Sequence, residues 1–175
     1  RLFSEGTFNA AFVPSYSSLL SKKKEAQIFA NNIFNLLIVG LFFLVLIIEI
    51  LMPLFVFLIA PGFEGDYQKM ELVIILTRIT FPFLMFISLA SFFSAILNSH
   101  NKFAIASAAP IILNILLIGV LLFGKILNDE LVYYLSYAVT ISGLLQLIFL
   151  YFFVKKHFSP KINLSFKIDN KVKLF

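Results

Sequence analysis

The sequence predicts an all-α protein, a polytopic bundle of transmembrane helices. Only 13% of its 175 residues are charged, whereas 61% are hydrophobic. A water-soluble domain carries about 25% charged residues, so this chain has too few charges to cover a soluble surface. The hydrophobic residues are gathered in four runs, each long enough to cross a bilayer as a helix. Together these two observations identify lipid as the solvent of most of the chain.

Four apolar runs are the predicted full spans, and a weaker segment precedes them. A bilayer core requires about 20 residues of helix, and each run reaches that length. A membrane strand needs only about 10 residues of alternating polarity. These runs do not alternate, which excludes strands. The predicted bundle covers residues 1–156, with a partial span at 2–20 and full spans at 28–60, 72–97, 103–123 and 131–154.

The first segment is only partly apolar, and we expect it to be the end of a helix that begins before residue 1. Arg1 and Glu5 are spaced i, i+4, and Asn9 follows one turn later. All three therefore occupy one helical face. An intramembrane charge costs about 2.5 kcal/mol or more and usually faces a partner or water. This face is predicted to line a cavity rather than to contact lipid.

The connectors between the runs alternate between net basic and net acidic. Lysine is in excess in residues 21–27, 99–102 and 155–175, and acidic residues are in excess in 61–71 and 124–130. An excess of lysine and arginine marks the cytoplasmic side of a membrane protein. The three basic connectors are therefore predicted to be cytoplasmic.

Three prolines, Pro53, Pro82 and Pro110, lie inside apolar runs. In a soluble helix each would cost about 3 kcal/mol, but neighbouring helices in a membrane bundle can satisfy the freed carbonyl groups. We interpret these prolines as static kinks. The alternative is a bend that moves during transport.

The last three spans each carry one stripe of small and weakly polar residues at three- and four-residue spacing, apart from one gap at Leu84. Lipid does not drive helices together, so such stripes mark helix contacts. A second interpretation is that some stripes line a water-filled central cavity. Both interpretations can hold at different depths of the helix bundle. The stripe residues are Thr77, Thr80, Ser88, Ser91, Ala95 and Asn98, then Ser107, Pro110 and Asn114, and finally Ser136, Thr140, Gly143 and Gln146.

Residues suited to catalysis or metal binding are sparse. The chain has no cysteine, and it contains no paired carboxylates beside a base, metal-ligand cluster or phosphate-binding glycine loop. We therefore predict no enzyme activity, cofactor or metal.

The lysines lie between apolar runs, which favours a membrane surface over nucleic acid as their partner. We interpret His100 and His157 as solvated loop residues, and the intramembrane Glu49 and Arg78 as paired or snorkelling side chains.

Several stretches of the sequence, in their order and spacing, resemble the lipid II flippase family (MurJ/MviN) of the multidrug and oligosaccharidyl-lipid exporter superfamily. They are RLFSEGTFNAAFVP, LIAPGF, RITFPFLMFISLASFFSAILNSHNKFAIASAAPIILN and AVTISGLLQLIF. The resemblance implies a fourteen-helix transporter with two six-helix lobes. This chain would supply the end of helix 2 and helices 3 to 6 of the N-terminal lobe. Residues 157–175 would be the cytoplasmic linker between the lobes.

The resemblance also implies a function. Members of the family flip lipid II, the undecaprenyl-diphosphate-linked peptidoglycan precursor, from the inner to the outer leaflet of the bacterial cytoplasmic membrane by alternating access. Their central cavity is cationic. Arg1 matches the second position of the basic pair in the helix 2 motif, and Glu5 matches its carboxylate.

The candidate residues for the substrate cavity or gate form two sets. The first is Arg1, Glu5 and Asn9, and the second is Ser88, Ser91, Asn98 and Asn114. The predicted partners are lipid II, membrane lipids and the machinery of cell-wall synthesis and division.

Two other functions stay open. One is a multidrug or other lipid-linked oligosaccharide exporter of the same superfamily; a multidrug exporter would prefer an acidic cavity for cations. The other is a non-transporting membrane scaffold subunit, whose stripes would be dry packing surfaces.

Overall fold

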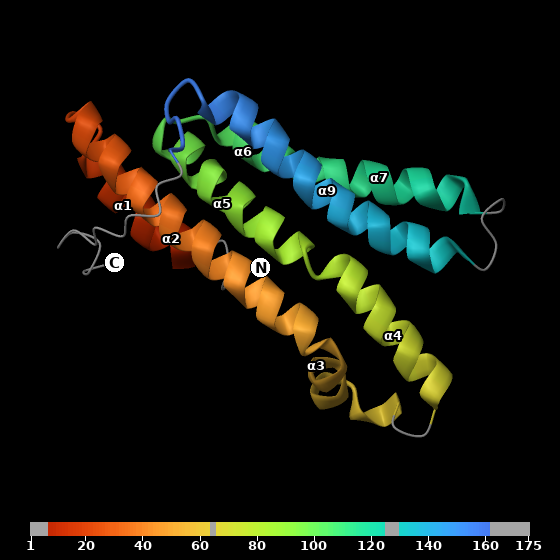
Figure 1. The fold of residues 1–175 in the computed structure, drawn as a ribbon. Coiled ribbons are helices and arrows are strands. Elements are labelled where there is room, and N and C mark those ends of the chain that lie inside the picture. The colour runs from red at the N-terminus through yellow and green to blue at the C-terminus, as the bar shows by residue number, and fades with distance from the viewer. Residues whose placement is uncertain (1–6, 64–65, 125–129, 162–175) are drawn as a thin grey trace.

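The computed structural model describes residues 7–63, 66–124 and 130–161, and every regular element in these ranges is a helix (Figure 1). Four helical stretches are long and apolar enough to cross a membrane, namely Lys23–Ile50, Tyr67–Ser99, Phe103–Leu122 and Leu131–Val154. The predicted fold class, an all-α polytopic bundle, is confirmed.

The helices follow the order of the apolar runs. Their bounds are α1 Thr7–Ser18, α2 Lys23–Ile50, α3 Met52–Ile59, the 3-10 turn η2 Pro61–Phe63, α4 Tyr67–Thr80, α5 Phe83–Ser99, α6 Phe103–Ala108, α7 Ile111–Leu122 and α9 Leu131–Val154.

Charged residues define two of the helix starts. Helix α2 begins at Lys23, earlier than the predicted residue 28, so most of the predicted connector 21–27 forms its first turns. Glu25 lies in the first turn of α2, where a carboxylate interacts favourably with the helix dipole, and pairs with Lys22 at 3.3 Å. Asp66 caps α4 by accepting the backbone N–H of Lys69 at 3.1 Å. Apolar length alone could not locate these starts.

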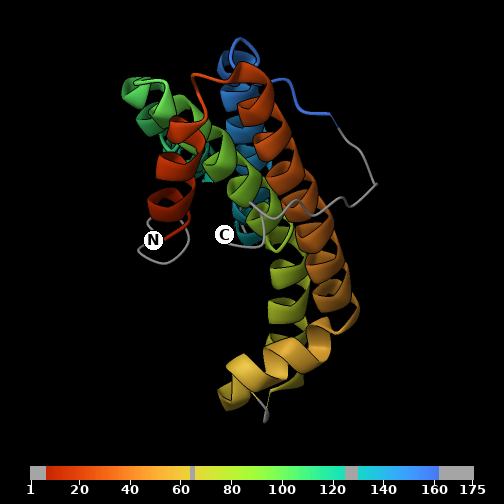
Figure 2. The same cartoon turned by 90° about the vertical axis from the view of Figure 1, so that its left-hand side faces the viewer.

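The predicted proline kinks are present as breaks between paired helices. Pro82 and Pro110 are the N-cap residues of α5 and α7, and Pro53 lies in the first turn of α3. At a helix start the missing N–H of proline leaves no intrahelical bond unmade. Helix α3 turns away from the direction of α2, as Figure 2 shows in orange and gold. The first predicted span, 28–60, is therefore one long helix followed by a short divergent one.

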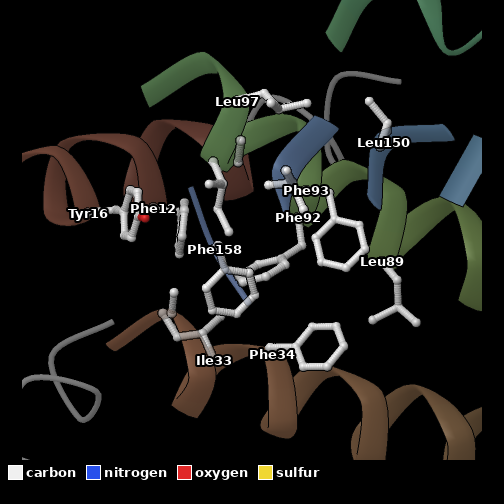
Figure 3. Close-up of a cluster of buried hydrophobic side chains, with 14 of the residues drawn as sticks. Phe12, Tyr16, Ile33, Phe34, Leu89, Phe92, Phe93, Leu97, Leu150 and Phe158 are labelled. Carbon is white, nitrogen blue, oxygen red and sulfur yellow. The ribbon is translucent and has the colours of Figure 1, made fainter. Parts of the chain in front are cut away.

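A cluster of buried aromatic and aliphatic side chains holds α1, α2, α5 and α9 together (Figure 3). Phe12 stacks on Phe29 with ring centroids 5.9 Å apart and meets the edge of Phe92 at 5.2 Å. Phe34 stacks on Phe93 at 5.7 Å. Such ring pairs contribute about 0.5–1.5 kcal/mol each beyond their buried area. The cluster makes α5 the central helix of the described bundle.

The cluster extends beyond the last helix. Phe158 is only 1% exposed and meets the edges of Phe34 and Phe92. Backbone groups of the following residues bond to α2: Ser159 O accepts from Gln27 Nε2 at 2.6 Å, and Lys161 N–H donates to Asn31 Oδ1 at 3.0 Å. The start of the predicted linker 157–175 therefore packs on the bundle. Residues 162–175 lie outside the described residues.

The described parts of the basic connectors gather at one end of the bundle, and those of the acidic connectors lie at the other (Figure 1). Two of the basic connectors contact each other, because the rings of His100 and His157 stack with centroids 4.1 Å apart. The helices therefore alternate in direction between two ends of opposite charge. This arrangement agrees with a multi-pass membrane protein.

Candidate functional site

A pocket of about 190 Å³ opens between α1, α5, α6 and α9. Its polar lining comes from four helices, of which α1 and α9 lie far from α5 and α6 in sequence. Helix α5 contributes most, because residues at three- and four-residue spacing share one face of a helix. The polar lining residues are Asn9, Ser91, Ser94, Asn98, Ser107 and Gln146.

All of these polar side chains are amides or hydroxyls. Among the described residues, no charged side chain lines the pocket. Amide and hydroxyl groups both donate and accept hydrogen bonds. The pocket can therefore bind an uncharged polar group or water. The described residues contain no group of three or more His, Cys, Asp or Glu side chains that could hold a metal ion.

Three lining residues have a buried polar atom with no hydrogen-bond partner. These atoms are Asn9 Oδ1, Ser91 Oγ and Gln146 Nε2. An unsatisfied buried donor or acceptor costs about 1–3 kcal/mol. Three such atoms around one pocket indicate groups that are satisfied when the pocket is filled.

The structure brings only some of the predicted site residues together. Asn9, Ser91 and Asn98 line the pocket. Ser88 does not line it, and its hydroxyl donates to Leu84 O in its own helix at 2.7 Å. Asn114 is exposed on α7 and is likewise absent from the lining. Residues that belong to one predicted stripe therefore do not all line the pocket.

The remaining first-set candidates, Arg1 and Glu5, lie outside the described residues. Three polar lining residues, Ser94, Ser107 and Gln146, were absent from both predicted sets. Ser107 and Gln146 belong to the stripes of their spans, so the spacing pattern did contain them. Ser94 lies three residues after Ser91 on α5 and could have been found by the same helical spacing.

Away from the pocket, α9 packs directly against its neighbours. Gly143 lies so close to α5 that a Cβ at this position would be 2.6 Å from Phe83 Cδ2 and 3.2 Å from Phe86 Cβ. One turn earlier, the hydroxyl of Thr140 donates to Ile79 O of α4. The α9 stripe therefore serves packing around Gly143 and lines the pocket at Gln146, as the sequence allowed.

The prediction that both histidines are solvated is wrong for His100. Its Nε2 atom is buried without a hydrogen-bond partner, and its ring lies between Tyr16 at 6.0 Å and His157 at 4.1 Å. Burial lowers the pKa of His100, and the neighbouring His157 lowers it further. The packing of α1 against the connector after α5 causes this burial, and loop composition does not reveal it.

The two intramembrane charges, Glu49 and Arg78, do not line the pocket. Arg78 is exposed on α4, which agrees with a side chain that snorkels. Oε1 of Glu49 is buried and has no hydrogen-bond partner among the described residues. In the described part of the chain, neither charged residue therefore belongs to the candidate site.

Comparison with known proteins gives a consistent result. The profile of the lipid II flippase MurJ family matches residues 1–175. A Rickettsia prowazekii protein named "probable lipid II flippase MurJ" is 39% identical over 158 residues, which are 89% of this chain and 31% of that protein. A Rhizobium tropici protein of the same name is 37% identical, over 95% of this chain and 32% of the relative.

A Burkholderia cenocepacia protein named "lipid II flippase MurJ" is 30% identical over 83% of this chain and 29% of its own length. The chain thus spans about a third of the length of the curated relatives that it matches.

Proposed function

This chain belongs to the lipid II flippase MurJ family, and from that membership we propose that it forms part of the N-terminal lobe of a transporter for lipid II. The transporter moves the undecaprenyl-diphosphate-linked precursor from the inner to the outer leaflet of the bacterial cytoplasmic membrane. It does so by alternating access, in which two lobes rock around a central site.

One structural observation carries this proposal beyond family membership. Polar faces of α1, α5, α6 and α9 meet around a common pocket, although lipid-exposed helices gain nothing from such faces. A scaffold subunit requires only dry contacts of the kind seen at Gly143. The pocket therefore favours a transporter over a scaffold.

The cavity face proposed for Arg1 and Glu5 is supported by their register with Asn9. Asn9 lines the pocket, and Glu5 and Arg1 precede it by four and eight residues. Arg1 supplies positive potential to a diphosphate, because the planar guanidinium matches phosphate geometry. Glu5 pairs with a cation and holds one of the two access states.

The orientation of the chain follows from its two charged ends. We place the basic end, with residues 21–27, 99–102 and 155–175, in the cytoplasm. The pocket lies toward this end, since Asn98 is the penultimate residue of α5 and Ser107 lies in α6 just after the basic turn. The headgroup therefore meets the pocket from the cytoplasmic side. Contacts with the cell-wall synthesis and division machinery stay a prediction.

Complementation in the full-length protein tests the assignment of Arg1 and Glu5. Arg1→Ala and Glu5→Gln should each impair growth of a cell depleted of its flippase. Glu71→Gln is the matched control, because Glu71 is exposed near the start of α4. Wild-type growth of both cavity variants at normal expression would reject these roles.

Cysteine accessibility separates the competing functions. In a full-length protein with no other cysteine, Asn9→Cys and Ser91→Cys should react with a water-soluble maleimide, and lipid II should reduce the reaction. Ser142→Cys should not react, because Ser142 is 0% exposed on α9. A scaffold predicts no labelling at any of the three sites. A multidrug exporter predicts protection by cationic drugs instead of lipid II.

A further inference from the structure

We propose that the pocket between α1, α5, α6 and α9 binds an uncharged amide or hydroxyl group of the substrate headgroup, and that Gln146 selects this group. The inference rests on the proposed function and adds a second point of recognition. Cationic side chains outside the pocket would bind the diphosphate, and the pocket would bind an uncharged group of the sugar-peptide headgroup.

The chemistry of the lining supports a neutral ligand. Among the described residues, the polar groups at the pocket are three amides and three hydroxyls. A diphosphate binds where Arg, Lys or a metal ion supplies positive charge. Amide and hydroxyl groups instead match ligands that both donate and accept hydrogen bonds.

Gln146 is the residue that points most directly to a missing partner. Its side chain is 1% exposed, it lines the pocket, and Nε2 makes no hydrogen bond. Asn9 and Ser91, which also line the pocket, contribute the acceptor Oδ1 and the hydroxyl Oγ, both unpaired. One amide group of a ligand can accept from Nε2 and donate to one of these oxygens.

The dimensions and rigidity of the pocket fit a small group. A volume of about 190 Å³ holds several water molecules or one acetamido group, but not a disaccharide. The terminal torsion of glutamine is broad, so rotation can bring Nε2 to the pocket surface. Gly143, one turn before Gln146, fixes α9 against α5. This contact packs α9, which carries Gln146, against α5, which carries Ser91.

Binding measurements on the purified full-length protein test the inference. The probes are lipid II and undecaprenyl diphosphate, which lacks the sugar-peptide headgroup. Gln146→Met preserves side-chain volume and should weaken lipid II binding about three- to tenfold, the loss of a typical hydrogen bond. Binding of undecaprenyl diphosphate should not change. Ser91→Ala provides a second, smaller perturbation with the same expected pattern.

Ser142→Ala is the matched control on α9, because its buried hydroxyl bonds to Val139 O in the same helix at 2.6 Å. It should leave both affinities unchanged. The inference is overturned if Gln146→Met and Ser91→Ala bind lipid II as the wild type does, or if they weaken both ligands equally. A wild-type protein that binds neither ligand contradicts the proposed function itself, and the inference falls with it.

Discussion

Replacing Gly143 with alanine perturbs a close contact between α9 and α5. The new Cβ would lie 2.6 Å from Phe83 Cδ2 and 3.2 Å from Phe86 Cβ, inside the ordinary carbon–carbon contact distance of about 3.5–4.0 Å. The ring of Phe83 can rotate away. Phe86 Cβ is attached directly to the backbone, so it can move only if α5 moves away from α9.

The expected magnitude combines two opposing effects. Overpacking a tight interior costs about 1–3 kcal/mol, whereas replacing glycine with alanine inside a helix gains about 0.5–1 kcal/mol. Gly143→Ala should therefore lower the free energy of unfolding by about 0–2.5 kcal/mol. Gly119 in α7 is the control, because a Cβ there meets nothing within 4 Å. Gly119→Ala should raise stability, so the difference between the two variants isolates the packing cost.

Thermal unfolding of the full-length protein in detergent measures this difference. Gly143→Ala should unfold at a lower temperature than Gly119→Ala, and Gly143→Leu at a lower temperature still. Equal melting temperatures for the two alanine variants would refute the close packing of α9 on α5.

Two further predictions concern the basic end of the bundle. The pKa of His100 is lowered, chiefly by burial and then by His157, so the unfolded chain binds the proton more tightly than the folded one. Stability should therefore be retained above the unfolded pKa of about 6.5 and fall as the pH drops from there toward the lower folded pKa. Thermal unfolding between pH 8 and pH 5 measures this loss of stability. The variant His157→Phe should lose less stability over the same range. A wild-type melting temperature that does not change with pH would contradict the prediction. Phe158→Ala should destabilise the protein by about 3–5 kcal/mol. Phe123→Ala, at a site 63% exposed, should change stability by less than about 0.5 kcal/mol. Equal effects of the two would show that Phe158 does not belong to the core.

The sequence predicted the membrane fold well because apolar length is a direct consequence of bilayer thickness. The clearest case is α9, whose bounds Leu131–Val154 coincide with the predicted run. Charged residues flank this run on both sides, so polarity changes abruptly at its ends. At Lys23 the same criterion failed, because lysines can extend a helix beyond the apolar core.

The candidate site was predicted only in part. Helical spacing placed Ser91 and Asn98 on one face, and both line the pocket. The same spacing included Ser88, whose hydroxyl bonds within its own helix. Whether a stripe faces a neighbour, a pocket or lipid depends on how the helices pack. That packing is set by long-range contacts such as Gly143 against Phe83, which sequence spacing does not contain.

The turn of α3 away from α2 has a consequence for how deeply the protein sits in the bilayer. Eight residues extend about 12 Å as a helix, too short to cross the hydrocarbon. Leu54, Leu58 and Ile59 are nonetheless exposed on it. A short apolar helix that turns away from the preceding span is most stable where acyl chains meet headgroups. Its exposed apolar side chains would hold the acidic end of the bundle at that depth of the bilayer.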